Sequence, residues 1–338
     1  MSYPLIILGA GASYDYIHSE DSRANEGMRP PLTNELFAPR FELIIKKFSH
    51  LGGLPGTIQG DIRNGLSLEE SMSRISRNVG KNPSRKVELA ATEFYLQALF
   101  REVSDSFGGQ SSNNYGALIQ EINDNFGKAI IVSFNYDILL EQALGFRIKR
   151  DDLRSYVSGP IKLIKVHGSC EWVHPISDYF IGSDVPMGKT YETIMQYPEY
   201  INSVRRDQFR VKRNYSEPSR QPQQNLHYYP AIAIPEPGKA GFVCPKSHID
   251  VLERELQDID KILIIGWKAG DTHFLKFLGE RIKDRKLPLS VVSPSDKALQ
   301  NIANKFREFS VDVSQASQKD CFSNFIGSKE CKTFFGTA

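Results

Sequence analysis

The sequence is poor in cysteine and carries no strong excess of charge of either sign. Four cysteines among 338 residues, Cys170, Cys244, Cys321 and Cys331, are too few for a disulfide scaffold, and they form no CxxC pair. The formal net charge is only +2, which argues against a nucleic-acid binder. We therefore expect no direct nucleic-acid binding, and we expect a reducing compartment, the cytoplasm, as the location.

Long apolar runs are also absent. No apolar stretch is long enough to span a bilayer. The first residues do not combine a basic segment with an apolar stretch and a cleavage site, so we expect neither a membrane anchor nor a signal peptide. Hydrophobic residues make up 40% and charged residues 24% of the chain. These fractions are typical of a globular protein with a substantial core.

The beginning of the chain carries a strand signal followed by a glycine turn. Residues 5–8 are consecutive aliphatic residues, a pattern typical of a buried strand of a parallel sheet. Gly9 and Gly11 follow in the stretch GAGAS, where missing side chains permit a tight bend and the close approach of a ligand. The third glycine of the GxGxxG fingerprint is replaced by Tyr14. The stretch therefore indicates either a phosphate-binding turn or plain strand-to-helix packing.

Hydrophobic patterning then predicts the domain organisation. Residues 41–127 carry apolar residues at helical spacing and form a predicted helical insertion. Further strands are expected over 128–134, 161–166, 231–235, 262–265 and 289–292. Strands that alternate with helices imply right-handed crossovers and a parallel sheet. The predicted fold class is α/β, a doubly wound, Rossmann-like parallel sheet formed by residues 1–40 and 128–338, with the helical insertion between them.

Several predicted strand ends carry glycine or polar residues, and ligands of a doubly wound sheet bind at the carboxyl ends of its strands. Asn135 and Asp137 follow one strand, and His167 follows the next. Two structural alternatives stay open. Asn135 and Asp137 could cap the helix expected from Ile138, which suits Asp137 better than Asn135. His167 could be a core histidine bonded to the backbone.

Taken in order, these motifs resemble those of the sirtuin superfamily. GAGAS at 9–13 is similar to the family's GAGxS turn, and SFNYD at 133–137 is similar to its TxNxD segment, with serine in place of threonine. HGS at 167–169 resembles its HG motif, and the loop 266–271 resembles its later glycine-bearing nucleotide loop. The resemblance implies NAD as the ligand and substrate.

The resemblance also implies roles for individual residues. Asn135 would lie near the nicotinamide ribose and help to place a nucleophile, Asp137 would receive the nicotinamide carboxamide, and His167 would be the general base. The implied cofactor-binding residues are Gly9, Ala10, Gly11, Ser13, Ser133, Gly266, Asp271 and Ser293. Cleavage of the nicotinamide–ribose bond develops positive charge on the ribose, which a preorganised polar cleft stabilises. An imidazole can accept a proton near neutral pH.

The chain departs from deacylating sirtuins, which carry a zinc ribbon with paired CxxC motifs. Cys170 and His174, like Cys244 and His248, have the spacing of half a tetrahedral zinc site. The two halves lie far apart in the sequence, so we expect no metal.

A zinc-less chain with a helical insertion resembles bacterial anti-phage defence effectors. That resemblance implies an NAD glycohydrolase that acts in abortive infection as a homo-oligomer. It also implies a partner such as a hexameric DNA-translocating ATPase or an Argonaute-like protein. Two alternatives remain open. One is an NAD-dependent protein deacylase or ADP-ribosyl transferase, and the other is a non-catalytic module that senses NAD or ADP-ribose.

Overall fold

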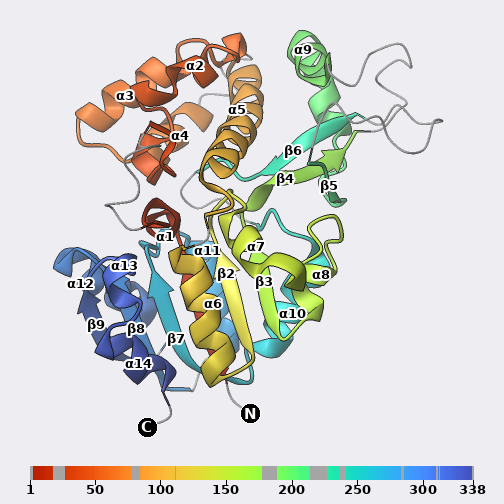
Figure 1. The fold of residues 1–338 in the computed structure, drawn as a ribbon. Coiled ribbons are helices and arrows are strands. Elements are labelled where there is room, and N and C mark those ends of the chain that lie inside the picture. Colours follow the sequence, from red (N-terminus) through yellow and green to blue (C-terminus); the bar gives the residue numbers. More distant parts are fainter. Residues whose placement is uncertain are drawn as a thin grey trace.

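A six-stranded parallel sheet forms the centre of the protein (Figure 1). The computed structural model describes residues 3–17, 27–77, 84–110, 112–176, 189–213, 227–235, 241–282, 285–309, 311 and 313–336. The strand order is β3-β2-β1-β7-β8-β9. The strands are β1 (Tyr3–Leu8), β2 (Ala129–Ser133), β3 (Ile161–Lys165), β7 (Ile259–Ile265), β8 (Leu287–Ser293) and β9 (Val313–Lys319). This order confirms the predicted Rossmann-like α/β fold class.

The first strand lies in the middle of this sheet. Every residue of β1 is buried, and Ile7 pairs with Val132 of β2 on one side and with Ile264 of β7 on the other. The chain first builds the sheet outward from β1 through β2 and β3, and later continues from β1 through β7, β8 and β9. The strand order therefore reverses between β1 and β7, the point at which doubly wound sheets bind ligands in a crevice at the carboxyl ends of the strands.

Helices cover the sheet and bury its apolar side chains in one large cluster. They are α6 (Asn114–Asn125), α7 (Leu139–Leu144), α8 (Ser155–Ser158), α10 (Lys246–Glu255), α11 (Thr272–Ile282), α12 (Asp296–Glu308), α13 (Phe322–Phe325) and α14 (Lys329–Phe335). Figure 1 shows α6 lying across the front of the sheet. Within the ranges given above, no helix has both the length and the apolar character needed to cross a bilayer.

A second hydrophobic cluster forms the upper part of the molecule in Figure 1. Its helices are α2 (Glu42–Ile45), α3 (Leu54–Arg63), α4 (Leu68–Ser76), α5 (Ser84–Phe107) and α9 (Thr190–Gln196). A three-stranded antiparallel sheet joins them, in the order β5 (Arg210–Val211), β4 (Gly168–Pro175) and β6 (Tyr228–Ile232). The segment expected as one insertion, 41–127, is thus divided. Helices α2 to α5 belong to this cluster, whereas α6 packs on the parallel sheet.

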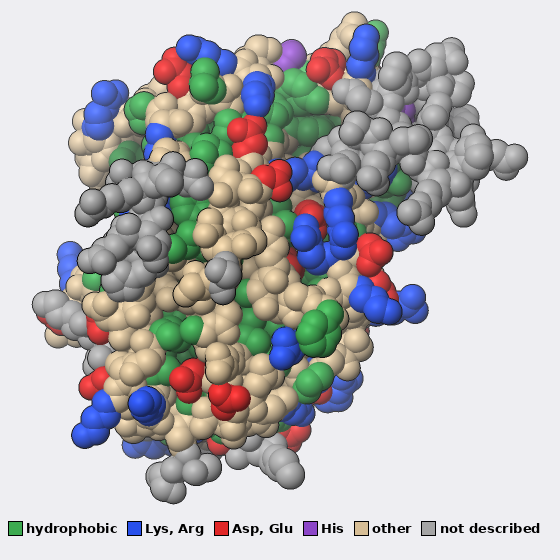
Figure 2. Space-filling model, viewed as in Figure 1, with side chains coloured by type: hydrophobic (Ala, Val, Ile, Leu, Met, Phe, Trp, Pro, Cys, Tyr) green, Lys and Arg blue, Asp and Glu red, His purple; other side chains and the backbone are tan. Residues whose placement is uncertain are grey.

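Short 3-10 segments complete the described part, at Thr33–Glu35, Pro39–Phe41, Ser49–Leu51, Gly145–Arg147 and Pro198–Ser203. Figure 2 shows acidic and basic side chains interspersed over the face in view. That distribution agrees with the nearly balanced charge of the sequence.

Candidate active site

The glycine turn after β1 crosses the turn after β7 at very close range. A Cβ atom on Gly9 would lie 2.6 Å from the Cα of Trp267, and one on Gly11 would lie 2.8 Å from the Cα of Gly266. Gly9 N donates to the carbonyl of Ile265 at 3.1 Å, and Gly11 N donates to that of Gly266 at 3.0 Å. Gly266 itself has a positive φ of 64°, which favours glycine. The glycines therefore allow two loops to pack together and hold the start of α1 (Ala10–Tyr14) in place.

Asn135 ties the loop after β2 to this turn. Its Nδ2 lies 3.0 Å from Gly9 O, 2.9 Å from Ser13 Oγ and 3.2 Å from the Tyr115 hydroxyl. A backbone carbonyl can only accept, so the contact with Gly9 fixes the orientation of the amide. Among the residues that the structure describes, none donates a hydrogen bond to Asn135 Oδ1. That oxygen is therefore free to contact a bound molecule.

Tyr115 is a site residue that sequence reasoning missed. It belongs to α6, and its hydroxyl lies 2.8 Å from Ser13 Oγ. The side chain is 1% exposed. Burial, reinforced by the charge of Asp137, raises the pKa of Tyr115 well above its usual value. The phenol therefore stays neutral and braces Ser13. In the sequence, this tyrosine on an amphipathic helix indicates only core packing.

Asp137 and Ser133 are both buried at the end of β2. Asp137 is 3% exposed, and its Oδ1 accepts a hydrogen bond from Leu139 N at the start of α7, at 3.2 Å. Burial raises the pKa of Asp137, although the nearby charge of Lys165 opposes the rise. Ser133 Oγ accepts a hydrogen bond from Asn135 N at 3.1 Å. The N-cap residue of α7 is Ile138, with no side-chain cap hydrogen bond, so neither Asp137 nor Asn135 is the N-cap of this helix.

His167 pairs with Asp271 across the sheet. His167 Nε2 lies 2.7 Å from Asp271 Oδ2, and Oδ1 of the same carboxylate accepts from Phe274 N at 2.8 Å. Although burial alone would raise the pKa of Asp271, the hydrogen bond and charge of His167 bring it below the usual value. An ionised carboxylate only accepts, so Nε2 carries the proton. In a neutral imidazole, Nδ1 then holds the free electron pair. Among the described residues, none bonds to Nδ1.

Aromatic rings connect this pair to the glycine turn. Phe134 stacks on Trp267 with ring centroids 4.6 Å apart and an interplanar angle of 16°. The same ring meets His167 edge to face, with a centroid distance of 4.9 Å. Because the Cα of Trp267 lies directly against Gly9, these groups form a continuous site. The structure therefore brings together three segments that are remote in sequence: the glycine turn, Asn135 and His167. The His167 side chain remains 25% exposed.

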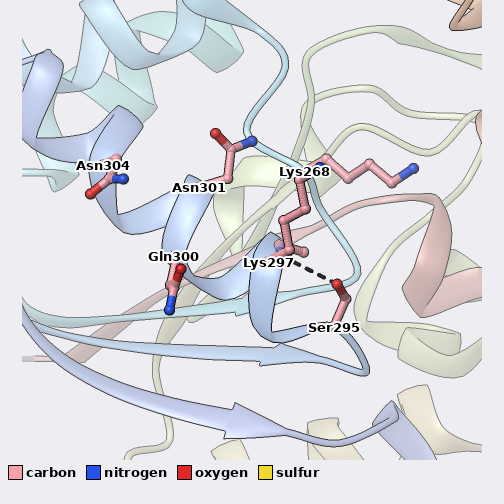
Figure 3. A pocket seen from close by; sticks show the side chains of 7 residues that line it. Lys268, Ser295, Lys297, Gln300, Asn301 and Asn304 are labelled. Carbon is pink, nitrogen blue, oxygen red and sulfur yellow. Dashed lines mark hydrogen bonds between the residues drawn. The ribbon is translucent and has the colours of Figure 1, made fainter.

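Two predicted cofactor-binding residues lie at the margins of this group. Ala10 begins α1 and is partly exposed. Ser293 ends β8, two strands away from β1, and its Oγ accepts from Ser295 N at 3.4 Å. Next to Ser295 lies an open hollow of about 570 Å³, between the loop after β7 and α12 (Figure 3). The hollow thus lies at the end of β8, whereas His167 follows β3 on the other side of β1.

The cysteine and histidine pairs with zinc-like spacing serve other contacts. His174 Nδ1 lies 2.8 Å from Gln208 O, and His248 Nε2 lies 2.7 Å from Leu153 O. Cys170 Sγ lies 4.0 Å from a serine hydroxyl, that of Ser104. Within the described ranges, no three His, Cys, Asp or Glu side chains are grouped so as to hold a metal ion.

The fold and site define a Rossmann-like α/β protein with a polar crevice at the carboxyl ends of its strands. No protein-family model and no curated protein sequence matches the chain. It is similar to the solved structure of a mutant Sir2 homologue in complex with 2'-O-acetyl ADP-ribose. The two are 13% identical over 99% of this chain and 94% of the other, with a TM-score of 0.44. A Sir2 homologue–NAD complex is 12% identical over 98% of this chain and 89% of the other, with a TM-score of 0.43.

Proposed function

We propose that this protein is an NAD glycohydrolase, which hydrolyses NAD to ADP-ribose and nicotinamide. The observation that carries the proposal is the His167–Asp271 pair, with its Nε2–Oδ2 distance of 2.7 Å. A carboxylate that orients an imidazole and stabilises its protonated form is a feature of general-base catalysis. A module that only binds a nucleotide has no need of such a pair.

The proposed reaction uses three groups of the crevice. The pyrophosphate of the substrate lies at the glycine turn, and its nicotinamide ribose faces His167. A water oxygen bonds to the anomeric carbon while the carbon–nitrogen bond to nicotinamide breaks. The electron pair of that bond neutralises the pyridinium nitrogen, and His167 Nδ1 takes the proton of the water. Asn135 Oδ1 accepts a hydrogen bond from the same water and orients it. Asp271 stabilises the imidazolium that results.

We further infer a biological role from the resemblance of the motifs. The protein would act in the cytoplasm as an anti-phage effector whose NAD hydrolysis causes abortive infection. A homo-oligomer and a partner, such as a hexameric DNA-translocating ATPase or an Argonaute-like protein, would activate it. Low turnover of the isolated chain would be in keeping with this role, because unregulated hydrolysis of NAD would harm the host.

The test is incubation of the purified protein with NAD, with and without an acetylated peptide and with and without candidate partners. A glycohydrolase releases ADP-ribose and nicotinamide in the absence of peptide. Turnover only with peptide would instead identify a deacylase. Binding without turnover in every condition would identify a sensing module.

The substitution His167→Ala tests the proposed role of this residue as the general base. We expect at least about a 100-fold loss of NAD hydrolysis, the usual effect of removing a general base. NAD affinity by calorimetry and the melting temperature should stay near the wild-type values, because the ring is partly exposed. The control is His50→Ala, at an exposed histidine of the helical region, which should retain full activity. Wild-type turnover in His167→Ala would remove this residue from the mechanism.

A further inference from the structure

The hollow between the loop after β7 and α12 is cationic. Lys268 lines it from the loop and Lys297 lines it from the first turn of α12. Figure 3 shows both side chains around the hollow, together with Ser295 and Asn301. The other described residues that line it carry hydroxyl, carboxamide and methyl groups, and none of them carries a carboxylate. The hollow therefore favours a ligand that carries negative charge and accepts hydrogen bonds.

The loop that carries Lys268 is held in place by contacts with its neighbours. Ala269 has a φ of 52°, in the left-handed region that side chains other than glycine rarely adopt. Lys305 of α12 donates from Nζ to the carbonyl of Ala269 at 3.0 Å. The loop begins at Gly266, packed against the glycine turn, and ends at Asp271, the partner of His167. The position of the hollow is thereby fixed relative to the proposed catalytic pair.

The position of the hollow in the sheet also suits the adenosine ribose of a dinucleotide. It is at the carboxyl end of β8, two strands from β1, whereas His167 follows β3 on the opposite side of β1. With adjacent strands about 4.8 Å apart, the hollow is about 10 Å from the glycine turn, measured across the sheet. This step rests on the proposed function: with the nicotinamide ribose at His167 and the pyrophosphate at the turn, the adenosine ribose extends toward the hollow.

The side chains at this end of a dinucleotide site determine which cofactor it prefers. Sites for NAD usually offer a carboxylate to the 2'-hydroxyl of the adenosine ribose, whereas a cation accommodates the 2'-phosphate of NADP. Here the lining residues that the structure describes include two lysines and no carboxylate. We propose that Lys268 and Lys297 form a subsite for a phosphate group on the adenosine ribose, so that the protein prefers NADP to NAD.

The test measures binding, so it does not require turnover. Adenosine 2',5'-bisphosphate and adenosine 5'-monophosphate differ by the 2'-phosphate, and calorimetry gives the affinity of the full chain for each. We expect the bisphosphate to bind at least about tenfold more tightly, as for a charge-assisted contact. The double variant K268A/K297A should lose this preference while it retains its affinity for the monophosphate. The control is Lys276→Ala, at an exposed lysine of α11 outside the hollow, which should keep the preference.

Equal affinity of the wild-type protein for the two nucleotides would overturn the proposal, as would a preference that survives in K268A/K297A. The glycohydrolase activity and the phosphate subsite can each be overturned without the other. Hydrolysis of NAD and NADP at equal efficiency would leave the glycohydrolase in place and remove the phosphate subsite. A lysine-dependent preference for the bisphosphate, with no hydrolysis of either dinucleotide in the presence or absence of candidate partners, would establish the subsite and remove the glycohydrolase.

Discussion

The Asp271 carboxylate has a different partner for each of its oxygens. Oδ1 accepts the hydrogen bond of Phe274 N at the start of α11, and Oδ2 faces His167 Nε2. The helix therefore fixes the carboxylate, and the carboxylate in turn fixes the imidazole. Sequence motifs assigned Asp271 to cofactor binding, whereas its contacts in the structure are with His167 and with the start of α11.

Asp271→Asn tests this positioning role. The start of α11 needs an acceptor, so the amide oxygen of the new side chain should face Phe274 N, and its Nδ2 should face His167. His167 Nε2 would then accept, and the proton would move to Nδ1, which could no longer act as a base. We expect kcat to fall about 10²- to 10⁴-fold with little change in KM or melting temperature. In the double variant D271N/H167A the loss should not exceed that of H167A alone. Unchanged kcat in Asp271→Asn would contradict the role.

Asn135→Ala tests the other polar group of the crevice. Truncation removes the oxygen proposed to orient the water, together with the donor to Gly9 O and Ser13 Oγ. We expect kcat to fall more than KM rises, because the contact with water matters most in the transition state. Loss of the buried hydrogen bonds should also cost about 1–3 kcal/mol of unfolding free energy. Steady-state kinetics and urea unfolding measure both effects. Asn125→Ala, at an exposed asparagine of α6, is the control. A rise of KM at constant kcat would argue for a binding role instead.

At the scale of elements, the site depends on two loops that cross at close range, and a Cβ atom would not fit at Gly9, Gly11 or Gly266. Gly9 and Gly11 after β1 face Gly266 and Trp267 after β7. These contacts link the two halves of the sheet at the point where the strand order reverses. Movement of either loop would displace both the glycine turn and the Phe134–Trp267 stack beneath His167.

Gly11→Ala should separate the two loops. The new Cβ would lie 2.8 Å from the Cα of Gly266, closer than such atoms can approach, so the backbone must shift. We expect a loss of about 1–3 kcal/mol of unfolding free energy, as for overpacking, and a loss of NAD hydrolysis. Gly60→Ala is a matched control, because Gly60 lies inside helix α3 with no atom within 4 Å of an added Cβ. That change should stabilise the protein by about 0.5–1 kcal/mol. Equal stability of the two variants would contradict the crossing.

These elements also show what the sequence could and could not predict. Buried strands are continuous apolar runs, and their carboxyl ends share one edge, so the strands and the polar residues after them could be found by pattern alone. His167 follows β3 and Asp271 follows β7, and β2 and β1 separate these strands in the sheet. Their contact therefore depends on the paths of the loops after the strands and could not be derived from the sequence. Tyr115 was missed because a helical pattern identifies a buried face without identifying what a hydroxyl on that face touches.

At the scale of the whole molecule, buried polar groups lie where the parallel sheet and its helices meet the second hydrophobic cluster with its antiparallel sheet. Gln97 of α5 donates to Trp172 O of β4 at 3.0 Å. The Trp172 ring packs in turn against His248 of α10, with centroids 5.7 Å apart. The side chain of His248 therefore lies where the helices of the parallel sheet contact the antiparallel sheet. A charge that develops there would affect the stability of both regions together.

His248 and His174 should make the protein sensitive to acid. Burial lowers the pKa of each to about 4, although each hydrogen bond to a backbone carbonyl opposes the shift. The unfolded chain has histidine pKa values near 6.5, so between about pH 6.5 and 4 it binds more protons than the folded protein. Above about pH 6.5 both histidines are neutral in the folded and the unfolded protein, so they do not reduce the free energy of unfolding. It should fall on acidification by about 1.4 kcal/mol per pH unit for each histidine.

His248→Gln separates this effect from general acid denaturation. A glutamine amide can donate to Leu153 O as His248 Nε2 does, but it does not titrate. We expect lower stability at pH 7, because the packing of the ring on Trp172 is lost. We also expect a clearly smaller fall between pH 6.5 and 4.5 in urea unfolding measured across that range. His50→Ala removes an exposed histidine and should keep the wild-type slope. If His248→Gln also keeps the wild-type dependence of stability on pH, the acid sensitivity must come from other groups. Protonation of buried His248 would then not limit the stability of this fold.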